Sequence, residues 1–225
     1  MKIRSVRLLA LLLPVACTTA LAAAQGASRL VASRHESAPP DGLAPSIAAA
    51  LAPGGVRVTA GRTPLEFWFV SALPLEPGSP GASWAAVDEG ALIGLVRIAE
   101  PFRDIRGRTI KPGVYTLRYG LQPDNGDHLG VSPYREFLLL SPASEDSDAA
   151  PRGHEGTIEI SKLAAGGSHP TALSLDPPVA TAEPLQATRT ELGHDALVLE
   201  VPVSRDGKPA GALRFGLVLI GRIEA

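Results

Sequence analysis

One stretch of the sequence, residues 119–140 (YGLQPDNGDHLGVSPYREFLLL), gathers the side chains that are best able to do chemistry. In it Asp127 precedes His128, and a carboxylate beside an imidazole can coordinate a divalent metal or exchange protons. The oxygen count and glycine register of a calcium loop are missing. We favour a hairpin connection, in which Asp-Asn-Gly forms the turn. A functional loop stays the alternative, because residues 124–134 make a longer connection than the about two to five residues that a hairpin needs.

A second histidine, His169, precedes a proline in the sequence GGSHP. Proline favours an extended conformation in the residue before it, so the imidazole is presented from a bend. If His128 and His169 converge, Asp127 or Glu155 would complete a metal or acid–base site. We favour a structural role for His169, in which its ring bonds to a backbone carbonyl. His154 and His194, each beside an acidic residue, are interpreted as surface turns.

Three consecutive aromatic residues, Phe67, Trp68 and Phe69, lie in a stretch of β-type residues. Successive residues of a strand point to opposite faces, so at least one large ring points away from the inner layer. We favour a core position for Trp68, covered by a second layer. The alternative is a recognition surface, through which a subunit of an envelope or electron-transfer complex would dock without a cofactor of its own.

The N-terminus has the pattern of a secretory signal peptide, with three basic residues before position 8, an apolar run and alanines at 22–24. We expect cleavage after Ala24 and a periplasmic or secreted mature chain. No later stretch is apolar for the about 20 residues that a transmembrane helix needs. A lipid anchor at Cys17 is the alternative, although Pro14 stands where such a site normally has Leu, Val or Ile.

The expected mature chain lacks the residues that several kinds of functional site require. The single cysteine and the single methionine both fall in the signal peptide, which excludes disulfides, thiolate zinc sites, CxxCH haem attachment and blue copper. The G-x-S-x-G motif of many serine hydrolases is missing as well. Signal cleavage removes three basic and no acidic residues, so the formal net charge changes from −2 to −5 and no basic patch predicts nucleic-acid binding. The sequence therefore predicts no cofactor.

Two regions follow the signal peptide. Residues 25–54 are rich in Ala, Pro and Gly, and we expect a flexible segment whose only regular structure is a short helix that Ser46 caps and that runs through Leu51. Residues 55–225 form a single domain in which short β-type runs alternate with turn residues. The predicted strands are 55–60, 64–73, 90–100, 113–123, 135–142, 197–204 and 210–224.

Alternation of side chains predicts which strand faces are buried. Within 113–123 the tyrosines and leucines from Tyr115 to Leu121 share one face, and Thr116 and Arg118 lie on the other, which we expect to be wet. In 197–204 the apolar odd-numbered residues predict an inner face, and Pro202 predicts an edge or a bulge. A helix is favoured from Glu155, and the acidic stretch 141–154 before it is expected to be a solvated loop.

The segment 104–123 carries the pattern G-x-x-I-x-x-G-x-Y-x-L at Gly107, Ile110, Gly113, Tyr115 and Leu117. It resembles a hairpin of uncharacterised exported bacterial β-sandwich proteins, of the domain-of-unknown-function type. The stretches 119–140 and GGSHPTALSL resemble a group of uncharacterised secreted proteins from environmental bacteria. The resemblance implies an immunoglobulin-like sandwich and no known activity.

Together these features predict an all-β fold, an antiparallel immunoglobulin-like β-sandwich with one or two short helices. The function that they favour is an exported, non-enzymatic module that binds or organises an envelope protein or a small ligand. The alternative is a metal-assisted or carbohydrate-acting enzyme with a loop site around His128 and His169.

Overall fold

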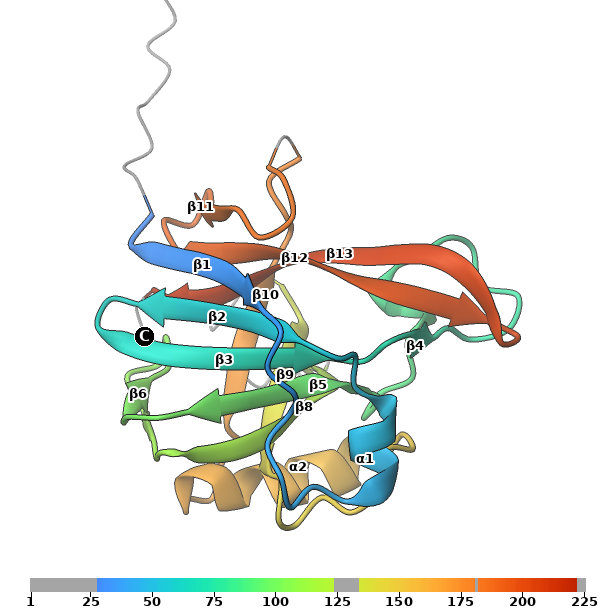
Figure 1. The fold of residues 1–225 in the computed structure, drawn as a ribbon, viewed down its shortest axis with the longest axis horizontal. Coiled ribbons are helices and arrows are strands. Elements are labelled where there is room, and N and C mark those ends of the chain that lie inside the picture. The colour runs from blue at the N-terminus through green and yellow to red at the C-terminus, as the bar shows by residue number, and fades with distance from the viewer. Residues whose placement is uncertain (1–27, 124–133, 181, 222–225) are drawn as a thin grey trace, which may run out of the picture.

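The computed structural model describes residues 28–123, 134–180 and 182–221 (Figure 1). Within these ranges the chain is mostly β and carries two α-helices, α1 (Pro45–Ala50) and α2 (Gly153–Ala165), and a 3-10 turn, η1 (Trp84–Ala86). The strands in the first half are β1 (Leu30–His35), β2 (Gly55–Ala60), β3 (Thr63–Phe69), β4 (Leu73–Pro74), β5 (Leu92–Ile98), β6 (Phe102–Arg103) and β7 (Thr109–Ile110). The remaining strands are β8 (Gly113–Leu121), β9 (Glu136–Pro142), β10 (Ala172–Asp176), β11 (Ala187–Arg189), β12 (Asp195–Arg205) and β13 (Lys208–Ile220).

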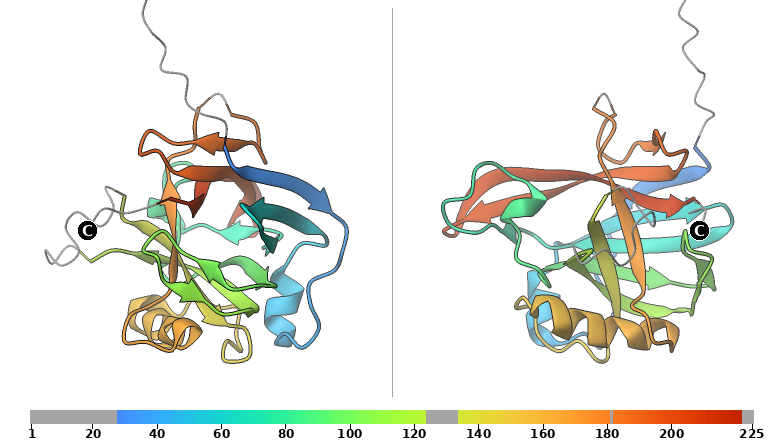
Figure 2. Two further views of the ribbon diagram at one scale, coloured as in Figure 1. Left: turned by 90° about the vertical axis from the view of Figure 1, so that its left-hand side faces the viewer. Right: turned by 180° about the vertical axis from the view of Figure 1, so that it is seen from behind.

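One large sheet follows the path β1-β2-β3-β5-β8-β9-β10-β13-β12-β11, with β4 pairing in parallel with β12. β6 and β7 form a separate small hairpin. The large sheet curls until β1 lies against β11 and β12 (Figure 2). At this seam Arg29 Nε donates to Asp195 Oδ2 at 2.8 Å. The mostly β class with two helices is confirmed, whereas the immunoglobulin-like sandwich is not, because the strands follow one curled path.

The inner face of the curled sheet holds the hydrophobic core. Along β12 the odd-numbered residues from Leu197 to Val203 are buried and Glu200 and Pro202 are exposed, so the predicted alternation is confirmed from Leu199 onward. Val198, on the face of Glu200 and Pro202, is fully buried instead. The register with β13 shifts between Pro202 and Ser204, which is the irregularity that proline predicts in a strand. The β12–β13 hairpin continues beyond the body of the sheet (Figure 1).

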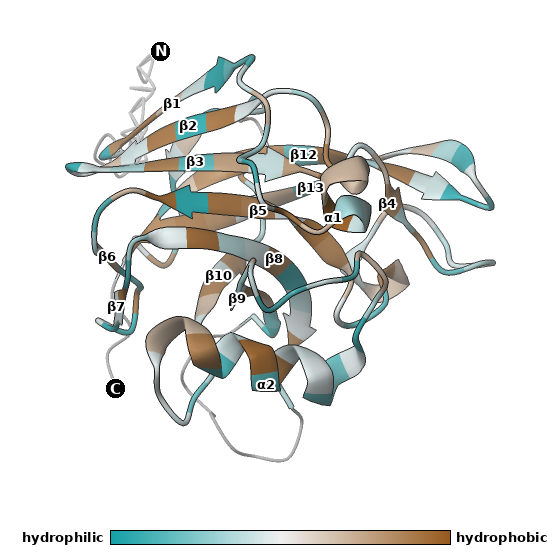
Figure 3. Cartoon of the chain, turned by 60° about the horizontal axis from the view of Figure 1, so that its bottom comes forward, coloured by the Kyte–Doolittle hydropathy of each residue, from teal (hydrophilic) through white to brown (hydrophobic). Residues whose placement is uncertain are grey.

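The outer face of β8 is not wet, contrary to the prediction. Thr116 and Arg118 are fully buried because α2 and the chain before it cover this face (Figure 3). The stretch 141–154, expected to be a solvated loop, supplies the cover: Asp146 is fully buried and accepts a hydrogen bond from Arg118 Nε at 2.6 Å. The charge on Arg118 is thus matched by a carboxylate from a distant part of the chain.

The segment expected to be flexible contains a strand as well as the predicted helix. β1 pairs antiparallel with β2, from Leu30 opposite Ala60 to His35 opposite Gly55, so its backbone hydrogen bonds add a strand at the sheet edge. The short helix is present as α1, but Ser46 does not cap it. Ser46 Oγ instead accepts the N–H of Ala149 at 3.2 Å. Within the described residues, no helix combines the length and apolar character that a membrane crossing requires.

Candidate functional site

The residues predicted to form a site lie in different places. Asp127 and His128 lie outside the described residues. His169 is exposed on the turn between α2 and β10. Trp68 is 1% exposed on β3 and donates from Nε1 to the Ser37 carbonyl at 2.9 Å. The chain after β1 therefore covers Trp68, as a core position requires, and the indole presents no surface to a partner.

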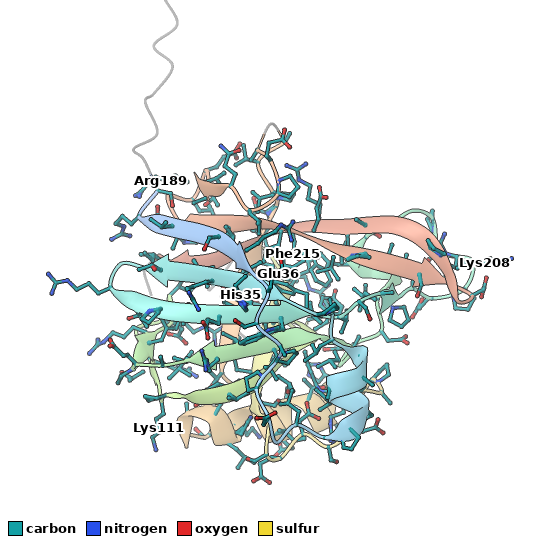
Figure 4. All side chains as sticks on the ribbon, viewed as in Figure 1. His35, Glu36, Lys111, Arg189, Lys208 and Phe215 are labelled. Atoms are coloured by element: carbon teal, nitrogen blue, oxygen red, sulfur yellow. The ribbon has the colours of Figure 1, made fainter. Side chains whose placement is uncertain are left out.

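His35, labelled in Figure 4, completes the cover of Trp68 at the end of β1. Its ring meets the indole edge-on, with centroids 5.2 Å apart and planes at 80°. The structure contradicts the interpretation of His154 and His194 as residues of surface turns. His194 is buried and pairs through Nδ1 with Asp176 Oδ2 at 3.1 Å, and His154 lies in the first turn of α2.

His169 lies at a cavity of about 250 Å³ between α2 and the sheet, which we name the α2 pocket. Its apolar lining comes from Leu121, Phe137, Leu139, Ile158 and Ala172. Its basic and imidazole side chains are Arg106, His154, Lys162 and His169. These four side chains come from the β6–β7 turn, from α2 and from the turn after α2.

The periodicities of α2 and β9 explain why these residues line the same cavity. His154, Ile158 and Lys162 are spaced by four residues, which puts them on one face of α2. Phe137 and Leu139 are alternate residues of β9, so both point to the outer face that α2 covers. The helix ends at Gly166, whose φ of 65° is a left-handed conformation that glycine adopts without strain. The chain then turns and brings His169 back to the pocket.

Two of the pocket's polar side chains are held by carboxylates. Nδ1 of His154 pairs with Glu89 Oε1, which also accepts the N–H of Leu121 at 3.1 Å. His154 is therefore tied to the end of β8, and Nε2 is the ring nitrogen left for a ligand. Lys162 Nζ lies 2.5 Å from Glu159 Oε1, one turn away on the same helix.

Arg106 has a different environment. Its guanidinium lies over the Phe137 ring, with Cζ 5.7 Å from the centroid. Burial, and then the charge of Arg108, lower the pKa of Arg106, while Asp104 raises it. Across the described part of the chain, this guanidinium makes no hydrogen bond and no ion pair. Arg106 is thus a partly desolvated cation on an aromatic ring, with donors available to a ligand.

The turn between β6 and β7 fixes the position of Arg106. Asp104 Oδ1 accepts the backbone N–H groups of Arg106 at 3.0 Å and Arg108 at 2.8 Å. Burial raises the pKa of Asp104, and these two hydrogen bonds only partly offset that effect. Arg108 Nη1 donates in turn to the Pro170 carbonyl at 3.3 Å, which joins this turn to the residue after His169.

The sequence pointed to His169 but not to the residues that accompany it. The spacing of His154, Ile158 and Lys162 was readable once a helix from residue 155 was expected, yet His154 was interpreted as a turn residue. Arg106 was not predicted, because its pairing with Phe137 joins residues 31 positions apart.

Within the described ranges, no group of three or more His, Cys, Asp or Glu residues is placed to hold a metal ion. The metal site at Asp127, His128 and His169 stays a prediction, since two of these residues lie outside those ranges.

Comparison with known proteins adds no assignment to this geometry. The resemblance to exported bacterial β-sandwich proteins therefore stays an expectation. No family model, no curated protein and no solved structure matches the chain.

Proposed function

We propose that the chain is an exported, non-enzymatic binding module whose α2 pocket takes a small molecule with an apolar body and one anionic group. The observation that carries the proposal is the guanidinium of Arg106, which lies on Phe137 and makes no hydrogen bond or ion pair with the described residues. A desolvated charge that lacks a partner costs free energy, and a bound anion regains it. An anion thus gains more binding free energy at Arg106 than at a solvated arginine.

The other lining residues narrow the ligand chemistry. Leu121, Leu139 and Ile158 offer apolar surface, so the part of the ligand next to the anionic group is apolar. A guanidinium binds a carboxylate through two parallel hydrogen bonds, and Nε2 of His154 offers a further polar contact. The cavity of about 250 Å³ is below the about 300–1,000 Å³ typical of drug-sized ligands. A carboxylate on a single ring or a short branched chain fits these requirements.

The N-terminal pattern supports the export part of the proposal. Cleavage after Ala24 would leave a mature chain that begins at Gln25. Intact-mass measurement of the protein purified from its native host tests this. The mass of residues 25–225 supports export by signal cleavage, and a lipid-modified chain that begins at Cys17 would replace the free mature form by an anchored one. The unprocessed mass would contradict export.

Binding to the α2 pocket is tested by titration calorimetry with benzoate and cyclohexanecarboxylate, with benzamide as the neutral analogue. We expect the carboxylates to bind and benzamide to bind at least about tenfold more weakly, because hydrogen bonds to charged groups contribute about 1.5–3 kcal/mol. Arg106→Gln should remove the preference for the carboxylate. Arg103→Gln is the matched control, because Arg103 belongs to the same hairpin but does not line the pocket. Equal binding of the carboxylate and the amide, or equal losses in the two variants, would overturn the proposal.

A further inference from the structure

A second cavity lies at a different place on the sheet and shares no lining residue with the α2 pocket. It has a volume of about 340 Å³, and we name it the aromatic cleft. The residues that define it are Trp84, Tyr134, Glu136, Asp176, Arg214 and Phe215. They come from η1, from the chain around the start of β9, from the end of β10 and from β13.

The aromatic residues give the cleft a rigid wall. Trp84 is half-buried and stacks on Tyr119, with centroids 4.8 Å apart and planes at 14°. It also meets Phe215, labelled in Figure 4, at 5.3 Å and 57°. Tyr119 is 1% exposed, and burial, followed by the charges of Glu136 and Glu89, raises its pKa. The indole is thus fixed by two buried rings, and Trp84 lines the cleft while it stays half-exposed.

Two residues of the cleft carry polar atoms without a partner. Oδ1 of Asp176 and Nε of Arg214 are buried, and neither atom has a hydrogen-bond partner in the described structure. Asp176 is 3% exposed, and its other oxygen, Oδ2, is occupied by Nδ1 of His194 at 3.1 Å. A buried polar atom that stays unpaired costs about 1–3 kcal/mol, so a ligand that pairs with it gains affinity.

The two unpaired atoms have opposite requirements. Asp176 Oδ1 is an acceptor and Arg214 Nε–H is a donor, so a simple cation or a simple anion would satisfy only one of them. A hydroxyl group both donates and accepts, and neighbouring hydroxyls on one molecule can serve both atoms. A flat apolar face on the same molecule would lie against Trp84. These requirements are met together by the rings of sugars.

We propose that the aromatic cleft binds a neutral carbohydrate, whose hydroxyl groups pair with Asp176 and Arg214 and whose ring contacts Trp84. The site is independent of the anion proposed for the α2 pocket, because the two cavities use different residues. Glu136 adds a further acceptor at the cleft. Binding involves no covalent step.

Fluorescence offers a direct test, because the chain has two tryptophans, of which Trp68 is buried and Trp84 is half-exposed. The mature protein is titrated with cellobiose, maltose and N-acetylglucosamine, and choline and inorganic phosphate serve as the cation and anion probes. We expect at least one sugar to change the emission of Trp84 saturably, with a dissociation constant at or below the millimolar range. The response should persist in Trp68→Phe and vanish in Trp84→Phe. Choline and phosphate should give no response.

Two variants test the polar contacts. Arg214→Met keeps the aliphatic stem and removes Nε, and should weaken sugar binding by about three- to tenfold, the range expected for one hydrogen bond. Arg214 also pairs with Glu200, with Nη1 and Oε1 3.6 Å apart, and its Nη2 donates to the Val179 carbonyl at 3.5 Å; neither Glu200 nor Val179 lines the cleft. Glu200→Gln is therefore the control and should leave binding unchanged. The proposal is overturned by the absence of any saturable sugar response, by preferential binding of choline or phosphate, or by equal losses in the two variants.

Discussion

Arg118 and Asp146 form an ion pair in which both side chains are fully buried, with Arg118 Nε 2.6 Å from Asp146 Oδ2. A second hydrogen bond joins Arg118 Nη2 to Asp146 Oδ1 at 2.9 Å. Arg118 Nη1 donates to the carbonyls of Gly90 and Ala150, and Thr116 Oγ1 donates to Asp146 at 2.6 Å. The pair fixes the chain that leads into α2, and so it positions the helix that carries His154.

Replacing Asp146 by Ala should destabilise the protein by about 3–5 kcal/mol, because the guanidinium of Arg118 would stay buried without its partner. Urea unfolding followed by circular dichroism measures the change. Glu145→Ala is the matched control, since Glu145 is the exposed neighbour of Asp146, and its effect should stay within about 0.5 kcal/mol. Similar losses in the two variants would show that the loop, and not the buried pair, carries the stability.

The pH dependence of stability should follow the same carboxylate. Burial alone would raise the pKa of Asp146, but the hydrogen bonds from Arg118 and Thr116 and the charge of Arg118 outweigh it and lower the pKa. A carboxyl whose pKa is lower in the folded state contributes stability above its unfolded value of about 3.9, and this is lost as the pH falls through the folded pKa. Asp104, with a raised pKa, acts in the opposite sense.

We therefore expect the free energy of unfolding to fall on acidification below about pH 4, and to fall less steeply in Asp146→Asn. Urea unfolding at a series of pH values between about 5 and 2.5 measures both slopes. Asp104→Asn is the informative comparison, because it removes a group whose effect has the other sign. An unchanged slope in Asp146→Asn would assign the acid sensitivity to other carboxyls, of which Glu66 has a pKa lowered by Arg57 and Arg97 despite burial.

Local patterns predicted the parts of the fold that depend on neighbouring residues. The alternation in β12 and the turn residues around β8 were sufficient to place these strands. The burial of Arg118 was not predictable in this way, because its partner Asp146 lies 28 residues further along the chain. β1 was missed because an edge strand needs only one apolar face, which here consists of Leu30 and the half-buried Ala32.

The α2 pocket likewise has features that local spacing predicts and contacts between distant segments that it does not predict. Its helical face was readable from residues spaced by four, whereas the pairing of His154 with Glu89 joins positions 65 residues apart. The orientation of the imidazole and the place of Arg106 over Phe137 depend on contacts between distant segments. Residue types alone could suggest that a histidine contributes to a site, but not which carboxylate holds it.

Gly90→Ala should disturb the contact between the start of β5 and α2. Gly90 has φ of +83°, and a Cβ there would lie 2.6 Å from the backbone nitrogen of Gly153 and 2.8 Å from that of Arg152. Gly78→Ala is the matched control, with φ of +76° and open space around the added Cβ. We expect the control to lose about 1–2 kcal/mol through backbone strain and Gly90→Ala to lose clearly more. Equal losses of stability in the two variants, measured by thermal unfolding, would show that α2 shifts to accommodate the added Cβ at no further cost.

Trp68→Phe should loosen the N-terminal segment without unfolding the sheet. The substitution removes the indole N–H that donates to the Ser37 carbonyl at 2.9 Å. Loss of this bond should cost about 1–2 kcal/mol and raise the amide exchange rates of β1. Strand β9, in the middle of the sheet, provides the internal reference. Uniform acceleration in β1 and β9 would point to global destabilisation and would contradict a local role for Trp68.

Ile158→Ala separates the apolar part of the α2 pocket from its charges. Ile158 lines the pocket between His154 and Lys162, so its truncation removes apolar contact with the ligand and leaves the cationic groups in place. Binding of cyclohexanecarboxylate should weaken by at least about fourfold, which corresponds to one buried methylene. Ile160→Ala is the matched control, because Ile160 is equally half-buried on α2 but does not line the pocket. It should change stability to a similar degree and leave affinity unchanged. Loss of affinity in both variants would mean that the substitutions weaken binding by destabilising α2. An unchanged affinity in Ile158→Ala would mean that the apolar part of the ligand does not contact Ile158.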